Sequence, residues 1–518
     1  MGVMGMDGSD DANDTDTTTI ALLIEVYEMN KPKILALLMI AALGLPFGAL
    51  NAQNWTRFTM QNSELGNSVL AMAADKKNNK WFGTELGMAR LSGRTWTDFS
   101  MFNEKLKGQY VNCLTVDGSG VIWIGTDDYG VIEFDGTHWT EYKDEMKRLQ
   151  MKFISKIAID KNDVKWIGVT LGGLVRYDGR DWEKYTAAET GLLSDFILCV
   201  AVDRRNRKWI GTNDGLSLYD ERRWISYTKQ NSGLPDNIVP AVVIDKNDVK
   251  WIATLGGLVR YDGTEWKVYD TDNSPLPCNQ VNDLAFDPSG ALWIVTDKGV
   301  ALFDGAKEWH VYTDKNTPLP ADVHRRVMVD SQGCKWFGSS LKGLTRFSAQ
   351  PIMGRVIDGQ GKPLAGVTIV CGTDEVKTDA DGRYYLEVAT NATVTLTPKA
   401  EGRTFEPATL RLATVTGARF GQDFVAASAL AASEVADDGG SGERVVVNPY
   451  LDQGYITLTL ESAEAEVEFV NAKTGESIRT MPHYRNGARI TISKMPRIDY
   501  KLYIRTSKGE KMLLFNLK

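Results

Sequence analysis

The stretch "VKWIATLGGLVRYDGTEW" at residues 249–266 is written almost letter for letter a second time in the chain. Residues 164–182 read "VKWIGVTLGGLVRYDGRDW". Two copies with the same hydrophobic pattern indicate one structural unit that the chain uses more than once. The same pattern extends, in weaker form, on both sides of these two copies.

Tryptophan marks each copy. One Trp opens a W-[IF]-x stretch in seven successive repeats, 42 or 43 residues apart, at Trp81, Trp123, Trp166, Trp209, Trp251, Trp293 and Trp336. A second series follows the turns, at Trp55, Trp96, Trp139, Trp182, Trp224, Trp266 and Trp309. The two series hold all 14 tryptophans, which we expect to be core residues. A period of about 40–45 residues is that of a β-propeller blade.

Each repeat reads as four short strands, such as "SKIAID", "KWIGVT", "GLVRYD" and "DWEKYT" within residues 155–186. An Asp stands six residues before the first Trp of every repeat, at Asp75, Asp117, Asp160, Asp203, Asp245, Asp287 and Asp330. Asn, Asp or Gly stands three residues before that Trp, and these residues tolerate a left-handed backbone. We therefore expect the recurring Asp to cap a turn rather than to bind a metal.

The two ends of the repeat region complement each other. The last repeat stops at "LTRFS" (344–348) without a fourth strand, and an unmatched outer strand, "NWTRFT" (54–59), precedes the first repeat. Pairing these segments closes the ring and removes the exposed sheet edges. The predicted fold class is all-β, with a seven-bladed β-propeller over residues 53–348 followed by two small β-sandwich domains.

The repeat W-[IF]-G-T-x-x-G-[LV]-x-x-[YF]-D resembles the propeller repeat of the periplasmic sensors of hybrid two-component systems, over residues 54–348. Some members of that family sense oligosaccharides, so the resemblance implies a binding role. No kinase motif and no membrane span follow the propeller, and direct signalling is therefore not expected of this chain.

Composition excludes several function classes. The formal net charge is −8, which argues against nucleic acid as a partner. The five cysteines, Cys113, Cys199, Cys278, Cys334 and Cys371, are scattered without a CxxC pair, so we expect small buried residues and no disulfide framework. HExxH, GxSxG, phosphate-loop and zinc-finger patterns are missing from the sequence, and we expect no cofactor and no metal.

Residues 29–53, "MNKPKILALLMIAALGLPFGALNAQ", have the form of a secretory signal peptide, with cleavage expected between Ala52 and Gln53. Residues 1–28 are acidic, which is a poor start for export, so we expect Met29 to be the initiator and treat residues 1–52 as extension and signal. The alternative is a single N-terminal membrane anchor. We expect no stable transmembrane span, because the apolar core is short.

Residues 349–426 lose the Trp period and resemble the carboxypeptidase regulatory-like β-sandwich. The matching pieces include "GKPLAGV" (361–367) and "TDADGRY" (378–384). The resemblance implies a non-catalytic adhesive or spacer module. Asp379 and Asp381 suit either calcium or a solvated turn, and the turn is favoured. Residues 427–443 are small, polar and Gly-rich, as in a linker.

Residues 444–518 resemble the type-A C-terminal sorting domain of the type IX secretion system of Bacteroidota. The matching residues are Asn448, Pro449, Gly475, Tyr500, Gly509 and the terminal run that ends at Lys518, whereas Ile498 replaces the family's usual Gly. The resemblance implies the type IX secretion machinery as a partner, export through the outer membrane and removal of this domain near the linker. We expect the mature protein to be secreted or attached to the outer-membrane surface.

Propeller ligands usually lie over one face, at the loops that join the second and third strands. In this chain those loops carry the candidate ligand-binding residues Asp127, Asp128, Tyr129, Asn213, Asp214, Asp297 and Lys298. An exposed Tyr beside amides and carboxylates suits sugar stacking and hydroxyl recognition. The alternative is that they are solvated loop tips. The segment "KDEMKRLQMKF" (143–153) breaks the pattern of the loops between repeats and is a second place to look for function.

We expect an exported propeller that binds a glycan or protein partner without catalysis. Two alternatives stay open. One is a polysaccharide-acting enzyme that uses the propeller channel, and the other is an accessory component of the type IX secretion machinery.

Overall fold

The computed structural model describes residues 54–100, 104, 106, 108–321, 323–427, 445–450, 455–460, 462–491, 495–496, 499–507 and 509–516. The signal peptide, its cleavage position at Ala52 and Gln53, nearly all of the linker, Ile498 and Lys518 lie outside the described residues. The chain divides into two compact units. The first extends to Gln350 and includes Glu387–Asn391 and Val415–Ala418, and the second holds the other residues from Pro351 onward.

The described part of the first unit contains seven four-stranded antiparallel sheets. Their first strands are β2 (Val69–Ala74), β6 (Val111–Val116), β10 (Ile154–Ile159), β14 (Ile197–Val202), β18 (Ala241–Ile244), β22 (Val281–Phe286) and β26 (His324–Val329). The second strands are β3 (Lys80–Thr84), β7 (Ile122–Thr126), β11 (Lys165–Val169), β15 (Lys208–Thr212), β19 (Lys250–Thr254), β23 (Leu292–Thr296) and β27 (Lys335–Ser339).

The third and fourth strands complete each sheet. The third strands are β4 (Gly87–Ser92), β8 (Val131–Phe134), β12 (Gly173–Tyr177), β16 (Leu216–Tyr219), β20 (Gly257–Tyr261), β24 (Gly299–Phe303) and β28 (Leu344–Phe347). The fourth are β5 (Thr95–Asp98), β9 (Trp139–Glu141), β13 (Trp182–Tyr185), β17 (Trp224–Tyr227), β21 (Trp266–Tyr269), β25 (Trp309–Tyr312) and, from the other end of the unit, β1 (Trp55–Phe58). One short helix, α2 (Lys143–Leu149), lies between β9 and β10.

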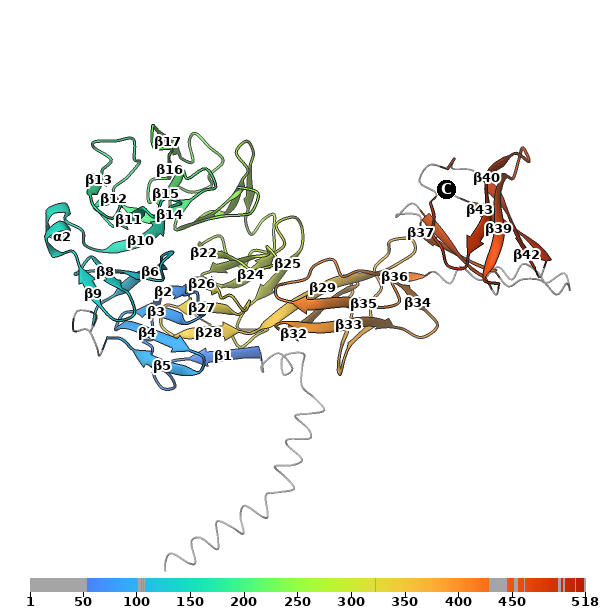
Figure 1. Ribbon diagram of the computed structural model, residues 1–518, viewed down its shortest axis with the longest axis horizontal. Helices are drawn as coiled ribbons and strands as arrows, with labels where there is room; N and C mark the ends of the chain where they lie inside the picture. The colour runs from blue at the N-terminus through green and yellow to red at the C-terminus, as the bar shows by residue number, and fades with distance from the viewer. Residues whose placement is uncertain are drawn as a thin grey trace, which may run out of the picture. The chain divides into compact units, whose positions relative to one another are not determined.

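The ring closes through β1. This strand pairs antiparallel with β28, with Trp55 opposite Phe347 and Phe58 opposite Leu344, so the predicted pairing of the two ends is confirmed. The first strands lie next to one another in a closed order, β2–β6–β10–β14–β18–β22–β26 and back to β2. Arg326 Nε donates to Leu70 O at 2.7 Å across that last junction. Figure 1 shows the first strands toward the middle of this propeller-like arrangement and the fourth strands β5, β9, β17 and β25 toward its outside.

The tryptophans form the core, as the sequence predicts. The first Trp of each sheet is buried, with 0–3% of its surface exposed in all seven sheets. In six of the seven sheets the second Trp stacks on an aromatic side chain of the neighbouring third strand, as Tyr261 and Trp266 do with ring centroids 4.1 Å apart, whereas Trp96 lies opposite Leu91. Burial of one such ring contributes roughly 2–3 kcal/mol to folding, so the repeated aromatic pairs account for much of the stability of the ring.

The recurring Asp caps the turn between the first and second strands, as predicted. Asp160 Oδ1 accepts the N–H groups of Asn162 at 2.9 Å and Val164 at 3.1 Å, and Oδ2 accepts the Trp166 indole N–H at 3.1 Å. The same three bonds occur at all seven positions. The predicted left-handed residues lie in these turns, for example Asp163 at φ 64° and Gly120 at φ 93°.

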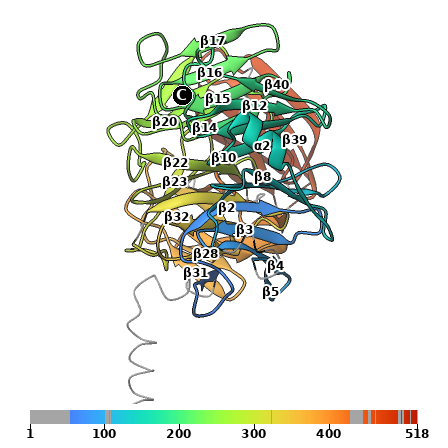
Figure 2. The same cartoon turned by 90° about the vertical axis from the view of Figure 1, so that its left-hand side faces the viewer.

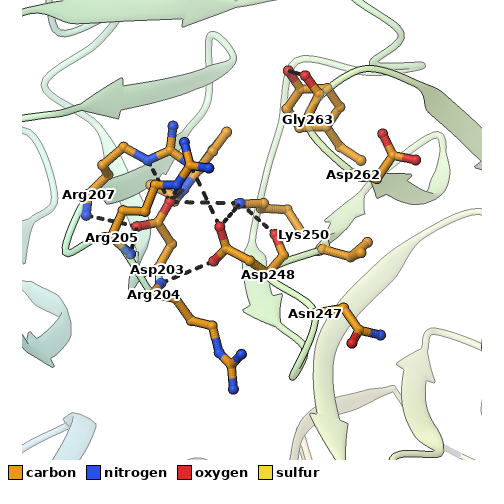
Figure 3. A network of polar contacts seen from close by, with 12 residues as sticks. Asp203, Arg204, Arg205, Arg207, Asn247, Asp248, Lys250, Asp262 and Gly263 are labelled. Carbon is orange, nitrogen blue, oxygen red and sulfur yellow. Dashed lines mark hydrogen bonds and ion pairs between the residues drawn. The ribbon is translucent and has the colours of Figure 1, made fainter.

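Buried lysines tie neighbouring sheets together at these turns. Lys208, Lys250 and Lys80 each precede a buried Trp and reach the turn Asp of the preceding sheet, at 3.3, 3.7 and 3.3 Å respectively. Figure 3 shows one such network, in which Asp203 accepts from Arg207 and faces Lys250, while Asp248 also contacts that lysine at 3.1 Å. The Lys250 ammonium also lies over the Trp209 ring, 5.2 Å from its centroid. These contacts give the recurring Asp a structural role between sheets.

Two segments from beyond residue 350 belong to the first unit. Thr390 Oγ1 donates to Ser348 O and accepts from the Gln350 side chain, both at 2.8 Å. The Ala418 N–H donates to Asp287 Oδ2 at 2.9 Å. The sequence did not predict these contacts, because they join residues that are 40 and 131 positions apart and carry no local pattern.

The second unit is also built from strands. One sheet contains β29 (Ala349–Asp358), β32 (Arg383–Ala389), β34 (Thr404–Glu406) and β36 (Phe424–Ala427), and another contains β30 (Thr368–Cys371), β31 (Asp374–Lys377), β33 (Ala392–Lys399) and β35 (Leu410–Val415). Further sheets contain β37 (Val445–Tyr450), β38 (Tyr455–Leu460) and β41 (Ile490–Thr491), then β39 (Glu464–Asn471), β40 (Ser477–Arg485), β42 (Asp499–Thr506) and β43 (Gly509–Asn516). Asp379 accepts the N–H groups of Asp381 and Arg383 at 2.9 and 2.8 Å, which is the geometry of a capped turn.

Candidate functional site

The first strands surround a cavity of about 130 Å³. All seven contribute to its lining, so this cavity is the central channel of the ring. One position, four residues before the turn Asp, lines it in every sheet: Ala71, Cys113, Lys156, Cys199, Ala241, Asp283 and Arg326. In six sheets the strand pairing shifts just before this position, a β-bulge that re-aims side chains, and such bulges are common beside functional sites.

The channel carries three charged groups. Lys156 is exposed, whereas Asp283 and Arg326 are half-buried. Asp283 accepts the N–H of Leu284 at 3.0 Å and the N–H of Val327 at 3.1 Å. Arg326 donates from Nε to Leu70 O at 2.7 Å and from Nη1 to Arg325 O at 3.1 Å. Backbone contacts therefore fix the acid and the guanidinium on the channel wall.

Two thiols share the same wall. Burial raises the pKa of Cys113 and of Cys199 to about 12, although the positive charges of Lys156 and Arg326 act in the opposite direction. Both cysteines are free. Because their pKa values are raised, both thiols are protonated at neutral pH. The prediction that the cysteines are small buried residues is confirmed for Cys113 and Cys199. Their position on the channel wall was not predicted.

The predicted ligand-binding residues lie at one end of the ring. Their loops, between β7 and β8, β15 and β16, and β23 and β24, are at the end where the first strands begin, since Val111 pairs with Thr126 there. Asp127 accepts a hydrogen bond from the Asn112 side chain, and Asp297 accepts one from Asn282 at 2.8 Å. Because Asn112 lines the cavity, this asparagine links the loop of Asp127 to the channel wall.

The other predicted residues stay at the loop tips. Asn213 accepts from the Ser194 hydroxyl at 2.7 Å. Asp128, Tyr129, Asp214 and Lys298 are exposed, and the backbone N–H groups of the last three are held by threonine hydroxyls of the second strands. The structure thus brings only the carboxylates of Asp127 and Asp297 against residues of the first strands.

The same end of the ring collects exposed apolar side chains. Eight large hydrophobic residues are exposed within the described part of the chain: Met60, Leu86, Tyr110, Tyr129, Phe153, Leu171, Ile238 and Leu341. Four lie in loops between second and third strands, and four lie in segments that lead into first strands. All eight therefore belong to the end of the ring at which the first strands begin, and we call this set the apolar rim.

Two rim residues have an unusual backbone. Phe153 and Leu171 have φ values of 54° and 62°, which large side chains rarely adopt. The Phe153 N–H donates to Asp127 O at 2.8 Å, and its carbonyl accepts the Thr170 N–H at 2.9 Å. Phe153 therefore lies between the loop of Asp127 and the loop of Leu171. Residues with a strained backbone cluster at functional sites. Phe153 and Leu171 therefore mark the sector of the apolar rim that is best suited to binding a partner.

Helix α2 supports that sector. The divergent segment 143–153 forms this helix and the Phe153 link, and the Leu149 side chain is buried. The Val131 N–H lies 3.4 Å from Met146 Sδ, so the helix packs against the loop that holds Asp127 and Tyr129. α2 lies beside β8 in Figure 1 and again in Figure 2. The divergence noted in the sequence therefore corresponds to a local scaffold beneath part of the rim.

Two further features concern metal binding and membrane insertion. No group of three or more His, Cys, Asp or Glu side chains that could hold a metal ion occurs among the described residues. No helix in that part of the chain is long and apolar enough to span a membrane.

Comparison with known proteins gives a family motif and a fold. Residues 105–128 match the family described as "Two component regulator propeller". The extracellular domain of a protein described as a hybrid two-component system from B. thetaiotaomicron has a TM-score of 0.52 and 16% identity, over 71% of this chain and 57% of that one. This chain thus spans little more than half of that structure.

Two further structures are similar at lower scores. A second extracellular domain from B. thetaiotaomicron has a TM-score of 0.49 and 14% identity, over 88% of this chain and 78% of that one. Virginiamycin B lyase from Staphylococcus aureus has a TM-score of 0.47 and 13% identity, over 56% of this chain and 98% of that one. No curated protein sequence matches this chain. The chain therefore carries a two-component regulator propeller repeat within an all-β, propeller-like fold.

Proposed function

We propose that this chain is an exported, seven-bladed propeller protein that binds a glycan or protein partner through its apolar rim and performs no catalysis. The observation that carries the proposal is the position of the eight exposed large hydrophobic residues, all at one end of the ring. Single exposed hydrophobic residues are normal on a protein surface, whereas their concentration on one face marks an interaction site.

The composition of the rim favours a protein partner over a glycan. Five of its eight residues are aliphatic, including Leu171 at 75% and Leu341 at 72% exposure. Aliphatic side chains fit the apolar core of a protein interface, whereas sugar rings stack on aromatic faces. Tyr110, Tyr129 and Phe153 supply three aromatic faces, so a glycan is the second candidate.

The side chains beside the rim support a role without catalysis. The Asp127 and Asp297 carboxylates accept from asparagine side chains, and Asp283 accepts from two backbone N–H groups. These hydrogen bonds occupy acceptor positions of the three carboxylates and tie them to protein groups instead of leaving them open to a substrate. The channel thiols are protonated at neutral pH, so neither is a ready nucleophile.

Export rests on the C-terminal segment and on the fold comparison. Tyr500 is fully buried and its hydroxyl donates to Pro496 O at 2.6 Å, and Gly475 adopts φ 75°, which explains why a Tyr and a Gly suit these two positions of the proposed sorting domain. The proposed module at residues 349–426 is a carboxypeptidase regulatory-like sandwich that serves as a spacer. The similar B. thetaiotaomicron structure is an extracellular domain, which agrees with a secreted or cell-surface location.

The test is site-specific photo-crosslinking in the full-length chain on cells. A crosslinker replaces Leu171 on the rim, and a control replaces Lys246, an exposed residue in the turn between β18 and β19 at the other end of the strands. We expect one adduct from position 171 and none from position 246. A partner identified in this way is then purified and titrated against the chain, beside a panel of polysaccharides.

A double variant gives the quantitative control. Phe153→Asn and Leu171→Asn remove apolar surface at two left-handed positions that Asn tolerates well, so folding should be preserved. We expect at least tenfold weaker binding of the identified partner or polysaccharide. Equal crosslinking from both ends, or unchanged affinity in the double variant, contradicts the rim as the binding face. Formation of a polysaccharide product contradicts the non-catalytic role.

A further inference from the structure

The central channel has more positive charge than its own acid neutralises. Its wall carries the cations Lys156 and Arg326 and the single anion Asp283. The Lys156 side chain makes no hydrogen bond and no ion pair within the described residues, and Lys156 is one of the residues that line the cavity. The Lys156 ammonium is exposed on the cavity wall, so it is available to pair with an anionic group that enters the channel.

Arg326 also has donors to spare. Backbone carbonyls take hydrogen bonds from Nε and Nη1, which leaves Nη2 without a partner in the described residues. These two bonds fix the plane of the guanidinium on the channel wall. A guanidinium held in one plane is suited to a planar, two-oxygen acceptor, because the spacing of its N–H groups matches that of a carboxylate.

The three charges occupy equivalent positions on different sheets. Lys156 is on the third sheet of the ring, and Asp283 and Arg326 are on the sixth and seventh, all four residues before the turn Asp. In a ring of seven sheets, the third lies across the channel from the sixth and seventh. A ligand in the channel therefore meets a cation on one side and a neighbouring acid–cation pair on the other.

Two more features describe the ligand. The other four places of this ring position carry small side chains, Ala71, Cys113, Cys199 and Ala241. The cavity volume of about 130 Å³ is close to that of engineered cavities of about 150 Å³ that hold one benzene molecule.

We propose that the channel binds one short aliphatic monocarboxylate, with its carboxylate between Lys156 and Arg326 and its alkyl part against the small side chains of Ala71, Cys113, Cys199 and Ala241. One negative charge neutralises the net single positive charge of the three groups. A dianion such as phosphate brings one charge too many beside Asp283, and a neutral molecule leaves Lys156 unpaired. This site is separate from the apolar rim and does not depend on the proposed partner.

The test uses the full-length chain and propionate, with propionamide as the uncharged control of nearly the same shape. Calorimetric titration should show one propionate site per chain and no propionamide binding. Lys156→Met should weaken propionate binding at least tenfold. Asp283→Asn should strengthen it several-fold, because the substitution removes the only negative charge on the wall. Lys246→Met changes the net charge by the same amount as Lys156→Met, but outside the cavity, and should leave the affinity unchanged.

These variants move the affinity in opposite directions, which misfolding does not do. Intrinsic fluorescence of the tryptophans reports whether each variant keeps the folded ring. The proposal is overturned if propionate and propionamide bind alike, if phosphate binds more tightly than propionate, or if Lys156→Met and Lys246→Met weaken binding equally. Its failure leaves the rim proposal intact, because crosslinking at position 171 does not involve the channel.

Discussion

Asp160→Asn tests whether the turn Asp stabilises the ring mainly through the buried lysine of the next sheet. Lys208 Nζ lies 3.3 Å from Asp160 Oδ2, and the two side chains are 0% and 1% exposed. Removing one partner of such a buried pair costs about 3–5 kcal/mol, since the other charge is left uncompensated. Lys208 keeps a 2.6 Å contact with Glu221, which is 56% exposed, so we expect the lower end, about 3 kcal/mol.

The chain supplies a matched control in Asp245→Asn. Asp245 makes the same bonds, to Asn247 at 2.8 Å, Val249 at 2.9 Å and the Trp251 indole at 3.5 Å. The residue before the next buried Trp is Leu292, so this Asp faces no lysine of the next sheet. Losing only the charge on the hydrogen-bond acceptor should cost about 1 kcal/mol. The difference between the two variants, about 2 kcal/mol, then measures the contacts of Asp160 with the next sheet, chiefly the buried lysine and also the Asn206 amide, which donates to Asp160 Oδ2 at 3.2 Å.

Equilibrium unfolding in urea, followed by tryptophan fluorescence, is the appropriate assay. All 14 tryptophans lie between residues 55 and 336, so the signal reports the ring and not the second unit. Adding Lys208→Met to Asp160→Asn should restore about 2 kcal/mol, because no buried charge is then left alone. Equal losses in Asp160→Asn and Asp245→Asn, or a double variant no more stable than Asp160→Asn alone, would refute the reasoning.

Three further outcomes follow from the same structure. Burial raises the pKa values of Asp75, Asp160 and Asp203, but the hydrogen bonds that these carboxylates accept outweigh it and lower the pKa values overall. The stability that the three carboxylates contribute is therefore present above about pH 4, and it is lost as the pH falls through their pKa values in the folded protein. Urea midpoints at pH 7, 4 and 3 should therefore fall in that order. Cys113 and Cys199 should resist iodoacetamide at pH 8 in the folded chain and react in urea, as mass spectrometry of the labelled peptides can show. Leu171→Asn should leave the free energy of unfolding unchanged or raise it by up to about 1 kcal/mol, because Asn tolerates φ 62° better than Leu. A lower free energy of unfolding contradicts the assignment of strain at this residue.

The sequence predicted the parts of the fold that repeat. Tryptophan at a fixed interval, an Asp six residues earlier and a left-handed residue between them specify a sheet and its first turn, and each was found in its expected role. The closure of the ring by Trp55–Phe58 could also be predicted from the sequence, because the last repeat lacks a fourth strand and the segment before the first repeat supplies one. The attachment of Glu387–Asn391 and Val415–Ala418 to the first unit was not, since those segments have no counterpart within the repeats.

The candidate site was only partly readable. The loops that hold Asp127 and Tyr129 were correctly placed at one end of the ring, but their neighbours Phe153 and Leu171 were missed as a pair. The charged channel was also missed, although a signal was present. Alignment of the repeats on the turn Asp shows small residues or cysteines at four of seven places and Lys156, Asp283 and Arg326 at the other three. A charged residue at a position that holds a small residue in the other repeats departs from the repeat pattern. Such departures are the places in a repeat sequence where a binding site can be sought.

The two ends of each first strand carry different tasks, and this separation explains how the ring can hold a binding surface. One end leads into the Asp turn, where Asp160, Lys208 and Trp166 are buried together and fix the sheets to one another. The other end opens at the bulge, where the pairing of the first and second strands is already interrupted. Strained residues such as Leu171 and unpaired charges such as Lys156 are tolerated at that end because the turn end supplies the stability. Substitutions at the rim and channel should therefore change binding with little change in the unfolding midpoint, and substitutions at the turns should do the reverse.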